Sequence, residues 1–151
     1  MVMNKIKVKK ISYFETFPVR SAVLRQGKPI ETCFFLGDDD KETVHFGLFD
    51  DVNLIGVASV FKVGNENFNK NNQFQLRGMA VLSKYQGMGF GRVIMDEICK
   101  LVVSKNAGVL WFNARETAVK FYQNFGFSVS GDAFEIPEVG THFVMFRHFV
   151  V

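Results

Sequence analysis

The sequence contains few of the features that would mark a secreted or membrane-bound protein. Its 151 residues include two cysteines, Cys33 and Cys99, which form no CxxC pair. Two isolated cysteines argue against a disulfide framework and favour a reducing compartment. No apolar run approaches the ~18 residues that a membrane span needs. The first residues lead straight into an alternating segment, without the pattern of a signal peptide. We therefore expect a soluble, cytoplasmic protein.

Charge and residue spacing argue against further classes of function. The formal net charge is +3, which is too small to suggest a nucleic-acid partner. No set of histidines, cysteines and carboxylates has the spacing of a metal site, and no motif indicates a Ser-His-Asp arrangement. The chain is 48% hydrophobic and 22% charged, so it has enough apolar material for a core. Its length suits a single domain over residues 1–151.

Hydrophobic periodicity predicts strands that alternate with helices. The predicted strands are 6–11, 44–49, 54–62, 75–82, 109–112, 127–130 and 141–150. The predicted helices are about 16–26, 90–104 and 118–125. We expect Thr16 to cap the first helix, and the segments 64–72 and 131–140 to be loops. This order of elements indicates an α/β or α+β domain.

The segment 86–92, QGMGFGR, is the most informative part of the chain. Three alternate glycines stand where a predicted strand gives way to a predicted helix. The first N–H groups of a helix have no intrahelical partner, and the helix dipole leaves that end partly positive. A glycine-rich loop there can bring its backbone close to a phosphate. The segment therefore predicts a phosphate-bearing cofactor.

Two common glycine motifs do not fit this segment. A P-loop needs Gly-Lys followed by Ser or Thr, whereas Gly91 is followed by Arg92 and Val93. A dinucleotide fingerprint needs G-x-G-x-x-G and an acidic residue after the next strand. Here the glycines are spaced G-x-G-x-G, and the predicted strand 109–112 has no carboxylate at its end. A nucleotide-binding protein of another fold is thus a weaker alternative.

A third pattern does fit, because Gln86-x-x-Gly89-x-Gly91 resembles the [Gln/Arg]-x-x-Gly-x-[Gly/Ala] signature of the GNAT superfamily of acyl-CoA-dependent N-acyltransferases. The preceding segment 76–81 resembles the fourth strand of that family, and 92–104 resembles its third helix. The segment 118–127, AVKFYQNFGF, resembles the family's A-x-x-[Leu/Phe]-Tyr-x-x-x-Gly-Phe element. The resemblance implies a mixed, mostly antiparallel central sheet flanked by helices. It also implies direct acetyl transfer from acetyl-CoA to a primary amine.

The resemblance further implies which residues contact acetyl-CoA. Backbone N–H groups of the glycine loop would hold the pyrophosphate, and the backbone of one strand would pair with the pantetheine arm and polarise the thioester carbonyl. Side chains in the segment 118–127 and at the end of the strand before it are expected to complete the cofactor contacts. These expected cofactor contacts are Met79, Ala80, Val81, Gln86, Gly87, Met88, Gly89, Phe90, Gly91, Arg92, Asn113, Phe121 and Tyr122.

Two residues are candidates for proton transfer. Tyr122 matches the family tyrosine that commonly protonates the departing thiolate; its spacing also suits a core residue on an apolar helix face. His142 is the candidate base, because histidine titrates near neutral pH; a hydrogen-bonded histidine in a solvated loop is the alternative. Many family members carry an asparagine seven residues before the tyrosine. In this sequence that position is occupied by Arg115, and Asn113 lies nine residues before Tyr122.

The acceptor is expected to be a small-molecule or peptide amine. The family builds acceptor sites from regions that correspond to 17–27, 64–72 and 131–141, and acidic residues in exposed turns hint at a cationic acceptor. Those acidic residues are Asp38, Asp39, Asp40, Glu135 and Glu138. Dimers are common in the family, so the resemblance is also compatible with a homodimer. A non-catalytic acyl-CoA-binding or sensing module on the same fold is the alternative function.

Overall fold

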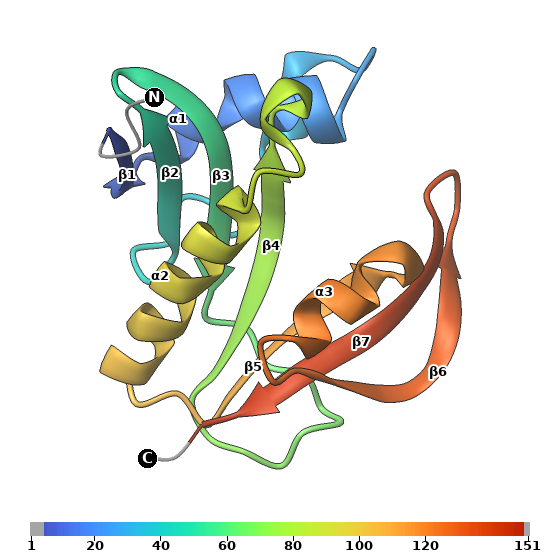
Figure 1. The fold of residues 1–151 in the computed structure, drawn as a ribbon. Helices are drawn as coiled ribbons and strands as arrows, with labels where there is room; N and C mark the ends of the chain where they lie inside the picture. Colours follow the sequence, from blue (N-terminus) through green and yellow to red (C-terminus); the bar gives the residue numbers. More distant parts are fainter. Residues whose placement is uncertain (1–4, 150–151) are drawn as a thin grey trace. The chain divides into compact units, whose positions relative to one another are not determined.

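A seven-stranded sheet with the order β1-β2-β3-β4-β5-β7-β6 organises the protein (Figure 1). The computed structural model describes residues 5–149. The strands are β1 (Ile6–Ile11), β2 (Val44–Asp50), β3 (Asn53–Phe61), β4 (Gln73–Val81), β5 (Val109–Arg115), β6 (Ser128–Ile136) and β7 (Gly140–His148). The α-helices are α1 (Tyr13–Val19), α2 (Phe90–Ser104) and α3 (Val119–Gln123). β4 and β5 pair in parallel, and β1–β2, β2–β3, β5–β7 and β6–β7 are antiparallel. The predicted mixed, mostly antiparallel sheet is confirmed.

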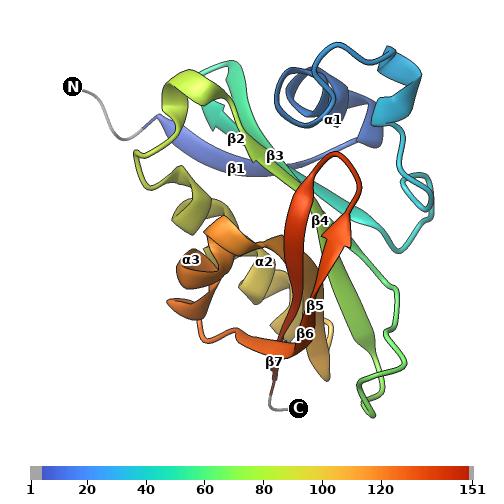
Figure 2. The ribbon, with the colours of Figure 1, turned by 90° about the vertical axis from the view of Figure 1, so that its right-hand side faces the viewer.

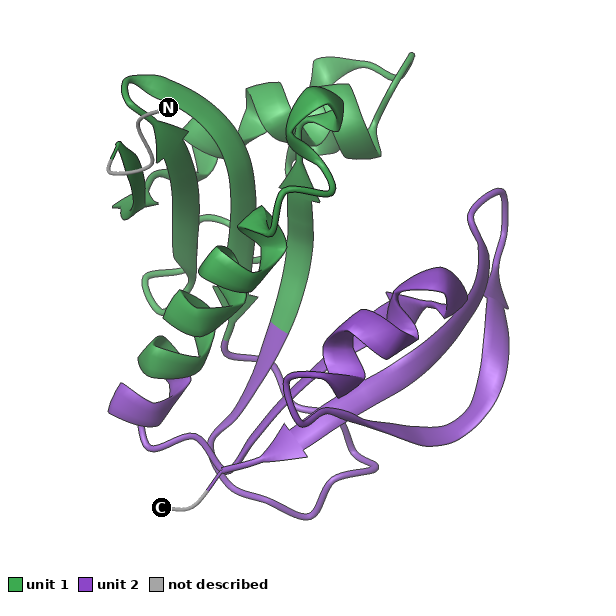
Figure 3. Cartoon of the chain, viewed as in Figure 1, with its two compact units in different colours: residues 1–61, 76–101 green, residues 62–75, 102–151 purple. Residues whose placement is uncertain are grey.

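The chain divides into two compact units (Figure 3). The first comprises 1–61 and 76–101, and the second comprises 62–75 and 102–151. The segment 76–101 brings most of β4, the glycine loop and the start of α2 into the first unit. The second unit holds β5, α3, β6 and β7.

In the first unit, α1 and α2 cover opposite faces of the strands (Figures 1 and 2). Val57 of β3 packs in one apolar cluster with Val19 of α1. Its neighbour Gly56 faces α2 instead, because a Cβ there would lie 3.2 Å from Ile94 Cδ1. Adjacent residues of a strand point to opposite faces of the sheet. The missing side chain at Gly56 therefore lets α2 lie close to β3.

The first helix begins one turn earlier than the sequence predicted. Ser12 is its N-cap: the Ser12 side chain accepts from the Glu15 N–H, and the Glu15 carboxylate accepts from the Ser12 N–H. This reciprocal capping box satisfies two donors at once, so the predicted cap at Thr16 is wrong. Thr16 lies buried inside α1, where its hydroxyl donates to the Tyr13 carbonyl. After Val19 the chain continues as a π-helical segment over Arg20–Leu24.

In the second unit, aromatic side chains tie the segment 62–72 to the strands. Phe68 forms a buried cluster with Val109 and Trp111, and Phe146 packs against it. The Trp111 indole Nε1–H donates to the Val63 carbonyl at 2.9 Å. The predicted loop 64–72 contains no helix or strand, as expected, and these contacts hold it against β5 and β7.

The late hairpin differs from the sequence prediction. Residues 131–136 continue β6 instead of forming a loop, so the turn before β7 covers only 137–139. The β6–β7 register shifts between Ser130 and Phe134, and Gly131 has φ +76°. A bulge of this kind places a turn-favouring residue inside a strand. The predicted last strand, 141–150, is observed as β7, and residue 150 lies outside the described residues.

Two structural features are absent from residues 5–149. No helix there is long and apolar enough to cross a membrane. In the same residues, no group of three or more His, Cys, Asp or Glu side chains is arranged to hold a metal ion.

Candidate functional site

The glycine loop of the first unit leads directly into α2. Gly87 has φ +79° and Gly89 has φ +85°, a conformation that other residues adopt only with strain. A Cβ atom at either position would meet nothing within 4 Å. The glycines are therefore needed for backbone conformation, and the space beside them is open. The Gln86 Nε2–H donates to the Val81 carbonyl at 2.8 Å, which ties the loop to the end of β4.

The start of α2 is suited to an anion. The first turn of this 15-residue helix contains no acidic residue, and it includes the exposed Arg92. Phe90 is buried and anchors the helix end, with its ring 6.1 Å from that of Tyr85. Unpaired N–H groups and the positive end of the helix dipole favour a negative ligand here. Met88 is exposed, so it leaves the backbone of the loop accessible.

β4 changes direction just before the expected pantetheine contacts. Gly78 has φ +66°, and a Cβ there would lie 2.9 Å from the Phe35 ring. The predicted close approach at Gly78 is confirmed, since only a residue without a side chain fits beside that ring. Met79, Ala80 and Val81 follow as the last residues of the strand. The structure thus places these three directly between the Gly78 irregularity and the glycine loop.

In the second unit, Tyr122 lies within an aromatic cluster. Its ring is 4.4 Å from that of Phe112 on β5 and 5.1 Å from that of Phe121 on α3. Burial raises the pKa of Tyr122 to about 12. The phenol therefore keeps its proton at neutral pH and is a donor, not a base. Phe121 is exposed, whereas Tyr122 is half-buried.

The register of β5 and β7 brings Arg115 opposite His142. Side chains of directly paired residues share one face of a sheet. His142 is buried, and its Nδ1 lies 2.8 Å from the Gly140 carbonyl. That carbonyl can only accept, so Nδ1 carries a proton, and Nε2 is the nitrogen left to exchange a proton with a ligand. Asn113 is exposed on the same strand, opposite Val144.

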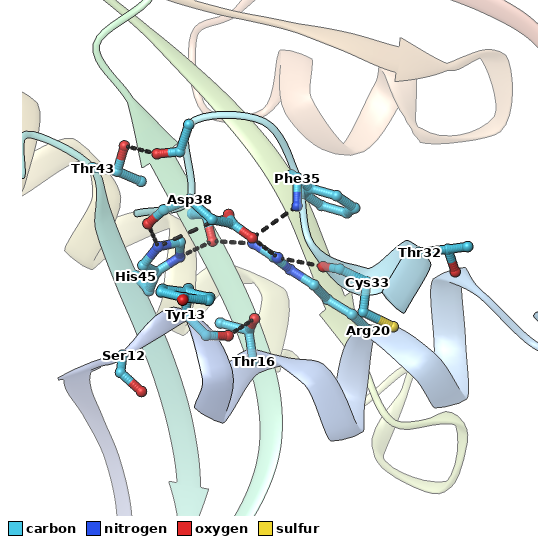
Figure 4. Close-up of polar contacts among 12 residues, drawn as sticks. Ser12, Tyr13, Thr16, Arg20, Thr32, Cys33, Phe35, Asp38, Thr43 and His45 are labelled. Carbon is cyan, nitrogen blue, oxygen red and sulfur yellow. Dashed lines mark hydrogen bonds and ion pairs between the residues drawn. The ribbon is translucent and has the colours of Figure 1, made fainter. Parts of the chain in front are cut away.

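A buried ion pair that the sequence did not reveal lies in the first unit (Figure 4). The Arg20 guanidinium donates to both carboxylate oxygens of Asp38, at 2.6 and 3.0 Å, and both side chains are fully buried. It also donates to the Cys33 carbonyl at 2.7 Å and to the Ser59 hydroxyl at 3.0 Å. The Phe35 N–H donates to the same carboxylate at 2.8 Å.

These bonds change the role expected of Asp38. Its carboxylate is fully occupied by Arg20 and the Phe35 N–H, so it has no surface for a cationic acceptor. Asp39 and Asp40 remain exposed beside it. Partners separated by 18 residues leave no periodic signal in a sequence. An acidic turn such as 37–41 is usually solvated, and only the fold shows that one of its carboxylates points inward.

His45 extends the network by two hydrogen bonds. Its Nε2 lies 2.9 Å from the Asp38 carbonyl, and its Nδ1 lies 2.6 Å from the Ser59 hydroxyl. The carbonyl can only accept, so Nε2 carries the proton. The Ser59 hydroxyl accepts from Arg20 and donates to Nδ1. Burial lowers the pKa of His45, the Arg20 charge lowers it further, and the Asp38 carbonyl and carboxylate oppose the shift.

We expect this histidine to make folding stability fall with acid. Because the pKa is lower in the folded state, the unfolded chain takes up the proton first as the pH falls below about 6.5. The stabilisation is complete above that pH and is lost progressively below it. Urea unfolding midpoints of the wild type and of His45→Gln between about pH 7.5 and about pH 5.5 check this. A decrease of equal size in both proteins would assign the acid sensitivity to other groups.

Three comparisons with known proteins show which proteins the chain is similar to. The family model described as "Acetyltransferase (GNAT) family" matches residues 11–127. The uncharacterised N-acetyltransferase YitI of Bacillus subtilis (strain 168) is 30% identical over 142 residues, which is 94% of this chain and 95% of that protein.

Solved structures share the fold at lower identity. A putative N-acetyltransferase from Lactobacillus plantarum has a TM-score of 0.78 at 15% identity, with 97% of this chain and 100% of that chain covered. The ribosomal-protein-S18-alanine N-acetyltransferase of Escherichia coli has a TM-score of 0.75 at 15% identity, with 93% and 92% covered. At this identity the likeness concerns the fold alone.

Proposed function

This chain belongs to the GNAT family of acetyltransferases and is an N-acetyltransferase, and we propose that it binds acetyl-CoA and transfers the acetyl group directly to a primary amine. The observation that carries the proposal is the backbone of Gly87 and Gly89, held at positive φ in open space before α2. Such a loop cradles a pyrophosphate with N–H groups and needs no lysine. Members of the family use acetyl-CoA as the co-substrate.

The remaining cofactor contacts follow from the order of residues along β4. With the pyrophosphate at the loop 86–92, the pantetheine arm runs back along Val81, Ala80 and Met79 and pairs with their backbone. The thioester then lies toward Gly78, where one of these N–H groups polarises its carbonyl. In the second unit, Asn113, Phe121 and Tyr122 are proposed as further contacts on the strength of the family motif.

The transfer forms a nitrogen–carbon bond and breaks the carbon–sulfur bond of the thioester. The amine must first be neutral, since an alkyl ammonium has a pKa of about 10.4. We propose His142 Nε2 as the acceptor of its proton, because Nδ1 is committed to the Gly140 carbonyl. Tyr122 is proposed to supply the proton that the departing thiolate takes up. The products are an N-acetyl amide and CoA.

We further propose that residues 1–151 act as one domain in the cytoplasm. The family model covers 11–127 and so draws on both compact units. Cys33 is buried and Cys99 is half-buried, and neither forms a disulfide within residues 5–149. Free thiols are the usual state in a reducing compartment.

Thermal unfolding with added ligands tests the cofactor assignment. A ligand at 100 times its Kd stabilises a protein by about 2.7 kcal/mol, which corresponds to a rise in Tm of about 5–10 °C for a chain of this size. We expect that rise with acetyl-CoA and CoA, and a smaller one with ATP or NAD. Gly89→Val forces a branched side chain into a positive φ and is expected to abolish it.

The control for this variant is Gly131→Ala. Gly131 also has positive φ and nothing within 4 Å of a Cβ position, but it lies in the β6 bulge, far along the chain from the loop. We expect Gly131→Ala to keep the response to CoA. An equal rise with ATP or NAD in the wild type, or no rise with either CoA species, contradicts the assignment of the loop.

A further inference from the structure

Three arginines of the first unit surround one phenylalanine ring. The guanidinium carbons of Arg20, Arg77 and Arg25 lie 3.9, 4.9 and 5.4 Å from the centre of the Phe35 ring. Arg77 also lies 5.4 Å from the centre of the Phe61 ring. Cations within about 6 Å of a ring centre are attracted to its face. The two rings therefore hold the Arg77 side chain in a defined position.

The positive charge of this cluster exceeds the negative charge that the protein supplies. Asp38 is bound through both oxygens by Arg20. Among the described residues, Arg25 donates to the carbonyls of Leu24 and Thr32 and to no carboxylate. Within residues 5–149, the Arg77 guanidinium has no hydrogen bond or ion pair. Within the described residues, two guanidinium groups of this cluster thus have no carboxylate directly hydrogen-bonded or ion-paired to them.

The half-buried state of Arg77 makes this imbalance costly. Burial lowers the pKa of Arg77, the charges of Arg20 and Arg25 lower it further, and Asp38 opposes the shift. A partly desolvated cation next to other cations is stabilised strongly by an anion. A guanidinium fork matches a carboxylate with two parallel hydrogen bonds. An anion from outside the protein would offset this charge.

The position of Arg77 on β4 indicates which molecule brings that anion. Arg77 precedes Met79 by two residues, and a strand advances about 3.3 Å per residue. It therefore lies up to about 7 Å farther from the glycine loop than Met79 does, since Gly78 between them is not extended. If the cofactor follows β4 as proposed, its phosphates are at the loop and its acetyl group ends near Gly78. Arg77 then lies beyond the acetyl end, on the side from which the acceptor approaches.

We propose that Arg77, assisted by Arg25, binds a carboxylate of the acceptor, so that the acceptor is a primary amine that also carries a carboxylate. This inference rests on the proposed function and names the substrate class of the same site. Of the acidic residues that suggested a cationic acceptor, Asp38 is occupied by Arg20 and is not available to the acceptor. The carboxylate fixes the acceptor at one end and leaves its amine to reach the thioester.

Matched acceptor pairs test this proposal. The standard amino acids and β-alanine are compared with their carboxamides, with release of CoA thiol as the readout. We expect the wild type to acetylate at least one acid much faster than its amide, because only the acid supplies the anion. In Arg77→Gln, the KM for that acid is expected to rise about 10- to 100-fold, as for the loss of a charged hydrogen bond, with the KM for acetyl-CoA unchanged.

Two further variants separate binding from packing. Arg77→Lys keeps the charge without the fork and is expected to give an intermediate KM. Lys28→Gln removes a positive charge from an exposed position near Arg25 in the chain and is expected to behave as the wild type. If Arg77 served only to pack against Phe35 and Phe61, Arg77→Gln would lower thermal stability without changing the preference for acid over amide.

The outcomes also separate this inference from the proposed function. The protein could bind CoA and still acetylate no acid faster than its amide, or acetylate neither. Either result overturns the carboxylate site and leaves the cofactor assignment intact. Faster acetylation of phosphoethanolamine than of β-alanine overturns the carboxylate site and indicates that Arg77 binds a phosphate of the acceptor. A rise in the KM for acetyl-CoA in Arg77→Gln overturns the placement of Arg77 on the acceptor side. Absence of CoA binding contradicts the proposed function itself.

Discussion

Replacing Tyr122 with phenylalanine is expected to lower kcat by about 10²- to 10⁴-fold, the usual contribution of a positioned general acid. Phenylalanine keeps the ring that packs 4.4 Å from Phe112 and 5.1 Å from Phe121. Only the hydroxyl is lost. Burial raises the pKa of Tyr122 to about 12, so the hydroxyl is protonated at neutral pH and can donate a hydrogen bond to the sulfur. The proposed role needs proton transfer to accompany the build-up of charge on the departing thiolate. Steady-state kinetics with acetyl-CoA and a responsive amine measure the effect.

A binding measurement must accompany the kinetics. We expect Tyr122→Phe to keep the rise in Tm with acetyl-CoA, because the proposed phosphate contacts are made by the loop 86–92. Tyr85→Phe removes a hydroxyl from another half-buried tyrosine and serves as the control. Wild-type turnover in Tyr122→Phe would show that Tyr122 is a core residue. A lasting loss of turnover at unchanged affinity would also exclude the non-catalytic acyl-CoA-binding module.

Replacing Arg20 with methionine is expected to lower the free energy of unfolding by about 3–5 kcal/mol, as for a buried ion pair that loses one partner. The variant leaves the Asp38 carboxylate fully buried with the Phe35 N–H as its remaining strong donor. It also removes the donors to the Cys33 carbonyl and the Ser59 hydroxyl. Since domains are stable by only about 5–15 kcal/mol, the urea midpoint should fall steeply.

A double-mutant cycle identifies the cause of that loss. Asp38→Asn alone removes the negative charge and leaves Arg20 buried with its charge uncompensated, so it is also expected to destabilise strongly. The double variant should be more stable than the sum of the two single effects implies, because neither uncompensated charge remains. Additive effects of the two substitutions would show that the ion pair is not the source. Lys28→Gln, at an exposed position, provides the baseline for loss of a surface charge.

The glycine loop and the main elements could be predicted because their signals are local. The φ values of Gly87 and Gly89 are a property of a few successive residues, so three alternate glycines before a helix were enough to indicate the loop. The strand and helix order followed from periodicity in the same way. Gly131 shows the limit of this inference, because a turn residue inside a bulge has the same local signature as one inside a loop.

Contacts between distant parts of the chain had no such signal. Arg20, Asp38, Ser59 and His45 lie on a π-helical segment, a turn and two strands. In the sequence each is an ordinary polar residue, and Arg20 is indistinguishable from a solvated helix residue. Burial of the four together depends on how α1 packs on β2 and β3. The excess of positive charge around Arg77 can be recognised only once Asp38 is known to be bound by Arg20.

The sequence by itself determined the family, the order of the elements and the glycine loop, because motif spacing and periodicity act over a few residues. The tertiary structure decided which charged side chains form ion pairs and which do not. Arg20 and Asp38 are partners because folding removes both from water, where an unpaired charge is costly. Arg77 has no hydrogen-bonded or ion-paired carboxylate within residues 5–149, because the buried Asp38 carboxylate nearby is already bound by Arg20. Electrostatic pairing depends on distance in space, and a sequence records only distance along the chain.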